Sequence, residues 1–234
     1  MSAPTRPPLP DRTAHRTARD TDPRLHRMLG PAVSHTLRER HQAILHLLKQ
    51  VVRHDLKHLR LLEVGCGSGI HLLEFLRMGF APQHLAGVEM RPERLALAQR
   101  VLPPTIKLHG GDACFMDIAP HSMDIVFQAT VFSSLPDTEA RIRLAETIWP
   151  WVKPGGGVLW YDRVVNDTRQ PEVRGLPMRH IRRLFPQAQL ESRRVTLAPP
   201  LAQTVCRISP HLYPLLNAIP QLRTHALVWI GKAC

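Results

Sequence analysis

Two kinds of apolar pattern alternate along the chain from residue 59 onward. Short apolar runs that end in glycine or polar residues indicate buried strands, whereas apolar residues recurring at three- and four-residue steps indicate amphipathic helices. The predicted strands are residues 59–65, 84–90, 106–112, 123–130, 157–165, 190–199 and 224–232. The predicted helices are residues 70–79, 92–102, 137–151 and 176–185, followed by a proline-punctuated, largely helical segment at 200–222.

Strands that alternate with helices at this spacing are typical of βαβ units, in which the strands run parallel. We therefore expect an α/β fold with a mostly parallel sheet and helices on both of its faces. Such sheets bind ligands at the carboxyl ends of their strands, near the point where the strand order reverses.

A further amphipathic helix is predicted over residues 34–59, with Ser34 as its N-cap. The glycine-rich run 153–157 predicts a turn. His54 and His58 are four residues apart and could share a helix face as a metal pair, but no third ligand stands at a suitable spacing. We expect these histidines to lie on the polar face and predict no metal site.

The composition is that of a globular protein. The 234-residue chain is 44% hydrophobic, which excludes disorder throughout and suits one domain. No run of about 18 apolar residues predicts a membrane-spanning helix, and the first residues lack the apolar core of a secretory signal. The four cysteines form no CxxC pair, which argues against a disulfide scaffold or a zinc finger. We expect a cytoplasmic protein.

The positive charge is concentrated at the front of the chain. The net charge is +12, and residues 1–60 hold 12 Lys or Arg against 5 Asp or Glu, which is +7 of that total. Residues 1–24 predict a flexible basic tail that either contacts a polyanion or serves only as a solvated segment. Aromatic residues make up only 5% of the chain, so there are few platforms for base stacking and nucleic acid is not the favoured partner.

The most informative motif is residues 63–69 (EVGCGSG), which follows the first strand and precedes a helix. Glycines at alternate positions allow a sharp turn, positive φ angles and close approach of a ligand to the backbone, while the helix start offers free N–H groups. A dinucleotide-binding GxGxxG loop requires glycine where Ile70 stands, and a P-loop requires a lysine that is absent here. The motif therefore favours a dinucleotide site less strongly, without excluding it. A glycine turn that binds no ligand is the other alternative. No base stands beside Cys66, so we expect a small residue there and not a nucleophile.

This loop resembles motif I of the class I S-adenosylmethionine-dependent methyltransferases. Glu89 ends the second strand, where the family holds the ribose hydroxyls with an acidic residue, and Met90 follows where a side chain packs on the adenine. Asp112, after the third strand, matches an acidic residue that accepts from the adenine amino group. Residues 123–137 and 151–162 resemble the family's motifs around strands four and five.

The resemblance implies a Rossmann-like, seven-stranded, mostly parallel sheet with the last strand antiparallel, and S-adenosylmethionine as the cofactor. A carboxylate such as Glu89 can accept from both ribose hydroxyls, and Glu63 with main-chain carbonyls suits the cationic methionine end. The expected cofactor-binding residues are Glu63, Gly65, Cys66, Gly67, Gly69, Glu89, Met90, Gly111, Asp112, Ala113 and Gln128.

The acceptor is expected in the polar loop after strand five. The chain has residues 132–135 (FSSL) where many relatives carry a general-base histidine, and no Asn-Pro-Pro-Tyr follows strand four, which speaks against methylation of adenine in nucleic acid. Residues 160–186 resemble a subgroup associated with lipopolysaccharide and glycan biosynthesis, which implies a sugar hydroxyl as the acceptor. A hydroxyl benefits from a general base. The expected catalytic residues are Asp162 and His180, with His35 and His41 ranked behind them; Asp162 is alternatively an acceptor for backbone N–H groups.

Arginines around this loop either bind a phosphate or carboxylate of the acceptor or form a solvated basic face. They are Arg169, Arg174, Arg179, Arg182 and Arg183. The apolar residues of the 200–222 insert have three alternatives: a wall of the acceptor site, a dimer or membrane-facing surface, or core packing. They are Leu212, Leu215, Leu216 and Ile219.

These expectations divide the chain into parts with separate tasks. The divisions are a tail at 1–24, a helical lid at 25–58, a cofactor-binding core at 59–165 and an acceptor-side half at 166–234 with the insert 200–222. The favoured function is O-methylation of a small molecule such as a sugar. An RNA or protein methyltransferase and a catalytically silent cofactor-binding partner protein remain as alternatives, and a homodimer is left open.

Overall fold

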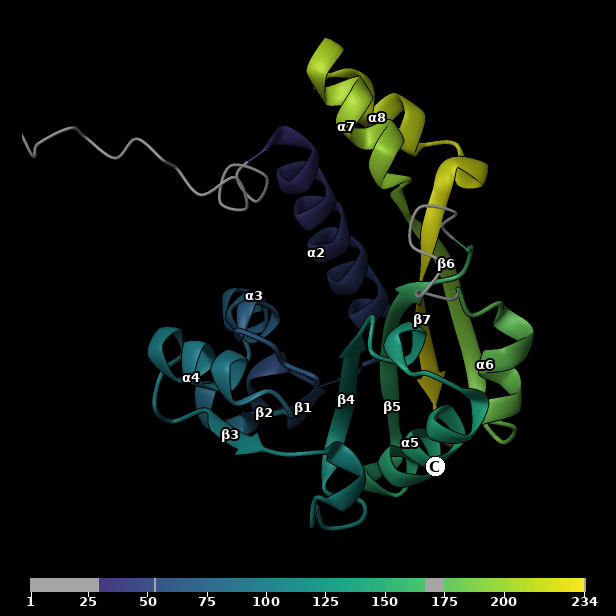
Figure 1. Ribbon diagram of the computed structural model, residues 1–234. Coiled ribbons are helices and arrows are strands. Elements are labelled where there is room, and N and C mark those ends of the chain that lie inside the picture. Colours follow the sequence, from purple (N-terminus) through teal and green to yellow (C-terminus); the bar gives the residue numbers. More distant parts are fainter. Residues whose placement is uncertain (1–29, 53, 167–174, 234) are drawn as a thin grey trace, which may run out of the picture.

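One seven-stranded sheet organises the structure, a computed structural model that describes residues 30–52, 54–166 and 175–233 (Figure 1). The strand order is β3-β2-β1-β4-β5-β7-β6. Strands β1 to β5 run parallel to one another, whereas β7 is antiparallel to both β5 and β6. The strands are β1 Leu61–Val64, β2 Leu85–Glu89, β3 Lys107–Gly110, β4 Met123–Ala129, β5 Val152–Arg163, β6 Gln189–Leu197 and β7 Arg223–Gly231. The Rossmann-like fold expected from the sequence is confirmed.

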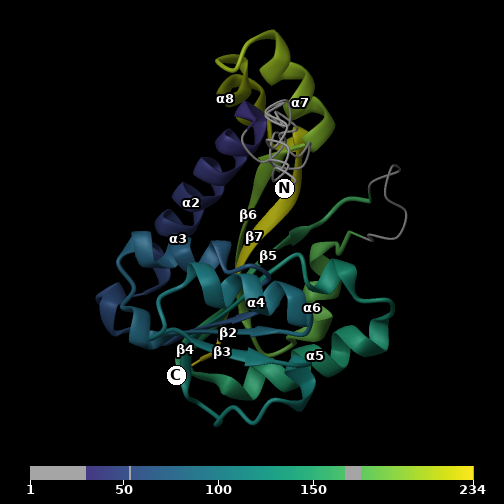
Figure 2. The same ribbon diagram turned by 60° about the vertical axis from the view of Figure 1, so that its left-hand side comes forward.

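Helices cover both faces of the sheet (Figures 1 and 2). Apolar residues of α2, α3 and α4 pack on one face, and those of α5 and α6 form a second core on the other. The helices are α2 Pro31–Val51, α3 Ile70–Met78, α4 Pro92–Val101, α5 Thr138–Trp151, α6 Met178–Leu184, α7 Pro199–Ile208 and α8 Leu212–Asn217. Short 3-10 turns are η2 Leu56–His58, η3 Pro82–His84, η4 Ala113–Phe115, η5 Phe132–Ser134 and η6 Pro220–Leu222. Within the described residues, no helix is both long and apolar enough to cross a membrane.

Two local predictions are wrong, each for a backbone reason. The first long helix spans Pro31–Val51 and not 34–59: proline suits its first position after the extended Gly30, and it ends at the extended Val52. The run 153–157 is not a turn: β5 continues through it from Val152, and the register shifts opposite Met123 and Ile125. Asp137 is the N-cap of α5, since its Oδ1 accepts from the Ala140 N–H at 2.8 Å. The expected tail at 1–24 lies outside the described residues.

A buried ion pair joins α2 to α3. Arg40 Nη2 donates to both carboxylate oxygens of Glu74, at 3.0 and 3.1 Å, and the two residues are 7% and 9% exposed. The Arg40 guanidinium also lies 5.4 Å from the centre of the Tyr161 ring on β5. Because breaking one partner of a buried pair leaves an uncompensated charge, this contact fixes α2 firmly in place.

A second polar contact fixes the first half of α2 to the β6–β7 end of the sheet. Glu39 accepts from the backbone N–H of Thr196 at 2.9 Å and from the Tyr213 hydroxyl at 3.2 Å. The Thr196 hydroxyl in turn lies 2.8 Å from the Tyr161 hydroxyl. This helix is therefore held by hydrogen bonds as well as by its apolar face.

His225 on β7 is buried beside these groups and predicts a pH-dependent stability. Its ring stacks on Tyr161 with centroids 5.1 Å apart. Burial, helped by the positive charges of Arg163 and Arg40, lowers the pKa of His225 from 6.5 to about 4. Between those pH values the unfolded chain binds more protons, so the free energy of unfolding falls as the pH drops from 6.5 towards 4, by at most about 3 kcal/mol from this group.

Replacing His225 by Phe retains the ring and removes the titration, so the variant should lose less stability than the parent between pH 7 and pH 4.5. Urea unfolding at both pH values measures the difference. The same substitution at His46, an exposed residue of α2, is the matched control and should leave the pH dependence of the parent. Equal pH dependence in the parent and the His225→Phe protein would contradict this account.

Candidate functional site

The glycine loop between β1 and α3 adopts a backbone that side chains disfavour. Gly65, Gly67 and Gly69 have φ angles of +69°, +55° and +83°. A Cβ at Gly65 would lie 2.7 Å from Val131, and one at Gly69 would lie 2.6 Å from Leu102. At Gly67 a Cβ would meet nothing within 4 Å, so this residue borders open space. The loop thus offers bare backbone to a ligand at Gly67.

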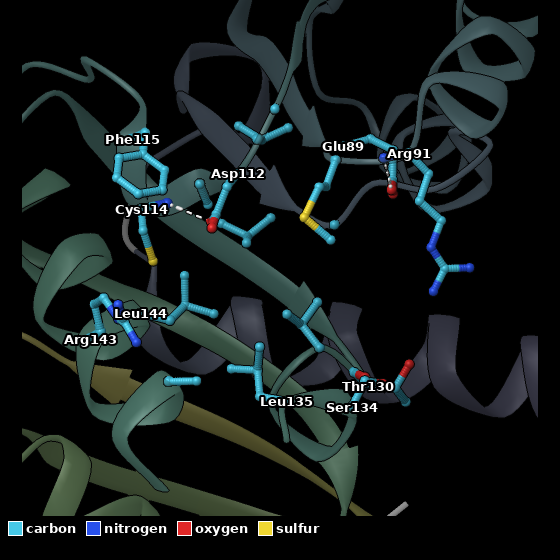
Figure 3. Close-up of a pocket in the computed structure, with 18 of the residues that line it drawn as sticks. Glu89, Arg91, Asp112, Cys114, Phe115, Thr130, Ser134, Leu135, Arg143 and Leu144 are labelled. Carbon is cyan, nitrogen blue, oxygen red and sulfur yellow. Dashed lines mark hydrogen bonds between the residues drawn. The ribbon is translucent and has the colours of Figure 1, made fainter. Parts of the chain in front are cut away.

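A cavity of about 480 Å³ lies beside this loop, at the carboxyl ends of β1 to β4 (Figure 3). Its volume is in the usual range for small-molecule sites. The residues expected from the sequence that line it are Gly65, Glu89, Met90, Gly111, Asp112 and Ala113. The residues predicted from the sequence therefore form most of one wall of this cavity.

Two carboxylates are held in place by backbone amides. Glu89 Oε2 accepts from the N–H of Gly67 at 2.8 Å, and its Oε1 accepts from that of Arg91 at 2.9 Å. Asp112 Oδ1 accepts from the N–H of Cys114 at 2.9 Å (Figure 3). A carboxylate has about four acceptor sites, so each group retains capacity for hydroxyl or amino donors of a ligand.

The opposite wall was missed by the sequence analysis. It comes from the loop after β4 and from α5, where Arg143 and Leu144 line the cavity opposite Glu89 (Figure 3). Met90 and Phe115 are 64% and 82% exposed, although both are large and apolar and line the same space. Flat apolar ligands suit such side chains. The other residues that line the cavity are Val64, Val88, Arg91, Arg94, Cys114, Ala129, Thr130, Val131, Ser134, Leu135 and Ala140.

Glu63 lies behind the glycine loop with one carboxylate oxygen unused. The residue is fully buried, and Oε1 lies 2.6 Å from Nδ1 of His71 on α3. Among the described residues, Oε2 has no hydrogen-bond partner. A buried acceptor without a donor is costly, so this oxygen suits a cationic or N–H-bearing ligand group. His71 was not indicated by the sequence, because only the fold brings it to Glu63.

Three expected cofactor residues play local structural parts. The Cys66 thiol points into the core against Gly87, and burial together with the charges of Glu63 and Glu89 raises its pKa to about 12. The thiol therefore does not face the cavity. Gly69 is the N-cap of α3. Gln128 is fully buried, and its side-chain oxygen accepts from the Val131 N–H at 3.0 Å.

Asp162 does not occupy the position expected of a catalytic base. The residue is completely buried, and its carboxylate accepts from the backbone N–H groups of Ser133 at 3.1 Å and Arg163 at 2.8 Å. Burial is the main cause that raises the pKa of Asp162, and the hydrogen bonds oppose it. The molecule to be methylated cannot reach this carboxylate. The alternative interpretation, in which Asp162 accepts hydrogen bonds from backbone N–H groups, describes it better.

His180 lies in a second hollow, of about 340 Å³, beyond the start of α5. Both polar and apolar residues line it. The polar lining residues are Thr138, Arg141, Asn166, Arg179 and His180. The segment from Ser134 to Leu144 contributes residues to both hollows. Arg169 and Arg174 lie outside the described residues, and no metal-binding cluster occurs among those described.

Comparison with known proteins agrees with this geometry. Residues 61–156 match a family described as a methyltransferase domain. No curated protein matches the sequence. A Mesorhizobium loti S-adenosylmethionine-dependent methyltransferase superposes with a TM-score of 0.57 at 16% identity, covering 81% of this chain and 96% of that one.

Two further structures have the same fold. Geranyl diphosphate C-methyltransferase from Streptomyces coelicolor, solved with S-adenosyl-L-homocysteine, superposes with a TM-score of 0.60 at 11% identity, covering 82% of this chain and 77% of that one. Phosphoethanolamine N-methyltransferase 2 from Haemonchus contortus, solved with S-adenosyl-L-methionine, gives 0.58 at 18% identity, covering 83% of this chain and 52% of that one.

The fold is that of S-adenosylmethionine-dependent methyltransferases, and residues 61–156 match a methyltransferase domain. The molecule to test against this site is therefore S-adenosylmethionine. The residues present fit that molecule, since open space borders Gly67 and an unpaired buried oxygen lies at Glu63.

Substituting Gly67 by Val should abolish cofactor binding, because the new side chain would fill the open space beside the loop. Isothermal titration calorimetry with S-adenosyl-L-homocysteine measures the effect. Gly79→Val is the matched control: Gly79 also has a positive φ (+105°) and open space, but it caps the far end of α3. The control should lose stability and retain the dissociation constant of the parent. Unchanged affinity in Gly67→Val would contradict the site.

Substituting Glu89 by Ala should raise the cofactor dissociation constant by about 10- to 100-fold, equivalent to about 1–3 kcal/mol for lost hydrogen bonds to a charged group. The change removes both a ligand acceptor and the support of the Gly67 N–H. Glu93→Ala, on the exposed start of α4, is the control and should bind as the parent does. The same titration measures both, and an unaffected Glu89→Ala protein would contradict the assignment.

Proposed function

We propose that this methyltransferase acts on a small-molecule acceptor, and that the methylated group is a hydroxyl of a sugar or related metabolite. The observation that carries the proposal is the pair of small hollows to which the segment from Ser134 to Leu144 contributes. The larger of the two suits the cofactor, and the other has polar and apolar lining residues. A volume of about 340 Å³ suits a metabolite better than a macromolecule.

In this proposal the cofactor occupies the larger cavity. Glu89 accepts from the ribose hydroxyls, Asp112 accepts from the adenine amino group, and Met90 and Phe115 cover the faces of the purine. The free Oε2 of Glu63 accepts from the ammonium of the methionine part. When bound, the cofactor supplies an electrophilic methyl group on a sulfonium, so the protein contributes alignment and exclusion of water.

The acceptor occupies the smaller hollow, and His180 is the proposed general base. Arg179 supplies a positive charge there, whereas the Arg141 guanidinium is already occupied by the carbonyls of Phe132 and Leu135. An acceptor with an anionic group fits this lining. The names of two structural neighbours, which act on geranyl diphosphate and phosphoethanolamine, support a phosphorylated small molecule. The sugar hydroxyl rests on the sequence resemblance to glycan-modifying enzymes.

With a base at His180, the His180→Gln protein should lose about 10²- to 10⁴-fold in kcat while binding the cofactor normally. The measurement is transfer of labelled methyl from S-adenosylmethionine to a panel of sugar nucleotides and phosphorylated sugars. His46→Gln, on the exposed face of α2, is the control and should retain the rate. A parent-like rate in His180→Gln would remove the base role.

The net charge of +12 favours a second candidate, an RNA methyltransferase. Such an enzyme would bind RNA with an affinity that falls steeply as salt rises. Filter binding tests this candidate, because absence of RNA binding at low salt would remove it. A protein that binds the cofactor but labels none of the acceptors would instead be the silent partner considered above.

A further inference from the structure

Large apolar side chains are exposed together on the α7–α8 hairpin. Four of the ten exposed large apolar side chains among the described residues lie there. They are Ile208 at 76%, Leu212 at 40%, Leu215 at 67% and Ile219 at 43% exposure. We call these four residues the α7–α8 apolar surface. A cluster of exposed apolar residues, unlike scattered ones, indicates a surface that binds a membrane or another molecule.

The apolar surface is not a misplaced part of the core, because the hairpin has a core of its own. Ala202, Cys206 and Tyr213 turn inward and pack with Leu197 of β6. The opposite side of the same helices therefore carries the exposed residues. In both views the hairpin extends beyond the sheet beside the start of α2 (Figures 1 and 2).

This end of the molecule is basic. From residue 192 to residue 231 the sequence has no Asp or Glu, whereas it has four arginines. They are Arg193, Arg194, Arg207 and Arg223. The nearest carboxylate on α2 is Glu39, which is already occupied by Thr196 and Tyr213. A negatively charged surface would therefore meet attraction here without repulsion.

The chain before α2 adds to this charge. Residues 1–29 contain six Arg and three Asp, which is +3, and they join α2 at its start. That start packs against the hairpin: Ala32 contacts the core of α7 and α8, and the Thr36 hydroxyl lies 3.2 Å from that of Tyr213. The start of α2, which residues 1–29 precede in the sequence, therefore lies beside the hairpin.

We propose that the α7–α8 apolar surface docks on an anionic lipid bilayer. Apolar side chains flanked by arginine are the combination that inserts into the headgroup region and is attracted to acidic lipids. The combination fits a bilayer better than a second copy of the chain, because two such surfaces facing each other would bring like charges together. Nucleic acid would meet the arginines but would leave Ile208 and Leu215 in water.

The docked orientation turns the carboxyl edge of the sheet towards the lipid. Leu197 of β6 is paired with Arg223 of β7, and Arg163 at the end of β5 is paired with His225, so the hairpin leaves the sheet at the same edge at which β5 ends. The cofactor cavity lies at that edge too. Docking and cofactor binding use different residues, so each can fail without the other.

The test is sedimentation of the full-length chain with vesicles. We expect binding to vesicles of equimolar phosphatidylcholine and phosphatidylglycerol, and no binding to phosphatidylcholine alone. The double substitution Ile208→Ser, Leu215→Ser removes the two most exposed apolar side chains and leaves the charge unchanged. It should weaken vesicle binding by about tenfold or more, with unchanged melting temperature and cofactor affinity.

The matched control makes the same kind of change elsewhere. Leu97 and Val101 on α4 are 48% and 51% exposed and lie outside both hollows, so Leu97→Ser, Val101→Ser should bind vesicles as the parent does. Parent-like binding by the Ile208→Ser, Leu215→Ser protein would mean adsorption through charge alone and would overturn the proposal. Absence of binding to the anionic vesicles, or a dimer in light scattering that the same double substitution dissociates, would also overturn it.

Discussion

The hydrogen bond from the Gly67 N–H to Glu89 is the contact on which the functional half of the molecule depends. It ties the turn after β1 to the end of β2 across 22 residues of sequence. The turn itself can form only because three alternate residues lack a side chain and accept positive φ angles. Loop and carboxylate fix each other, so the floor of the cofactor cavity exists before any ligand arrives. This preorganisation lowers the entropic cost of binding.

The parts of the structure that are governed by local pattern could be predicted from the sequence. The apolar patterns in the sequence predicted all seven strands and the order of the helices. The pattern is strong because the strands of a parallel sheet with both faces covered are apolar on both sides. The wall made by Glu89, Met90 and Asp112 was found because each residue follows directly on the end of a strand. Such positions converge at one edge of a parallel sheet whatever the remaining details.

The parts that depend on tertiary packing could not be predicted in this way. Asp162 and Trp160 point to the same face of β5, and only the packing of η5 against that face buries the carboxylate under the Ser133 N–H. Arg143 and Leu144 reach the cavity because α5 folds back over β4, which no motif encodes. Similarly, His71 meets Glu63 only after the glycine loop has turned α3 back along the sheet.

The buried Arg40–Glu74 pair has a consequence for how the two ends of the molecule communicate. Because α2 contacts the α7–α8 hairpin near its start and the glycine-loop helix α3 through Arg40, it spans the distance between them as one rigid rod. The hairpin and the helix that follows the glycine loop are thus fixed to the same helix, through contacts at Thr36 and Arg40 that lie four residues apart.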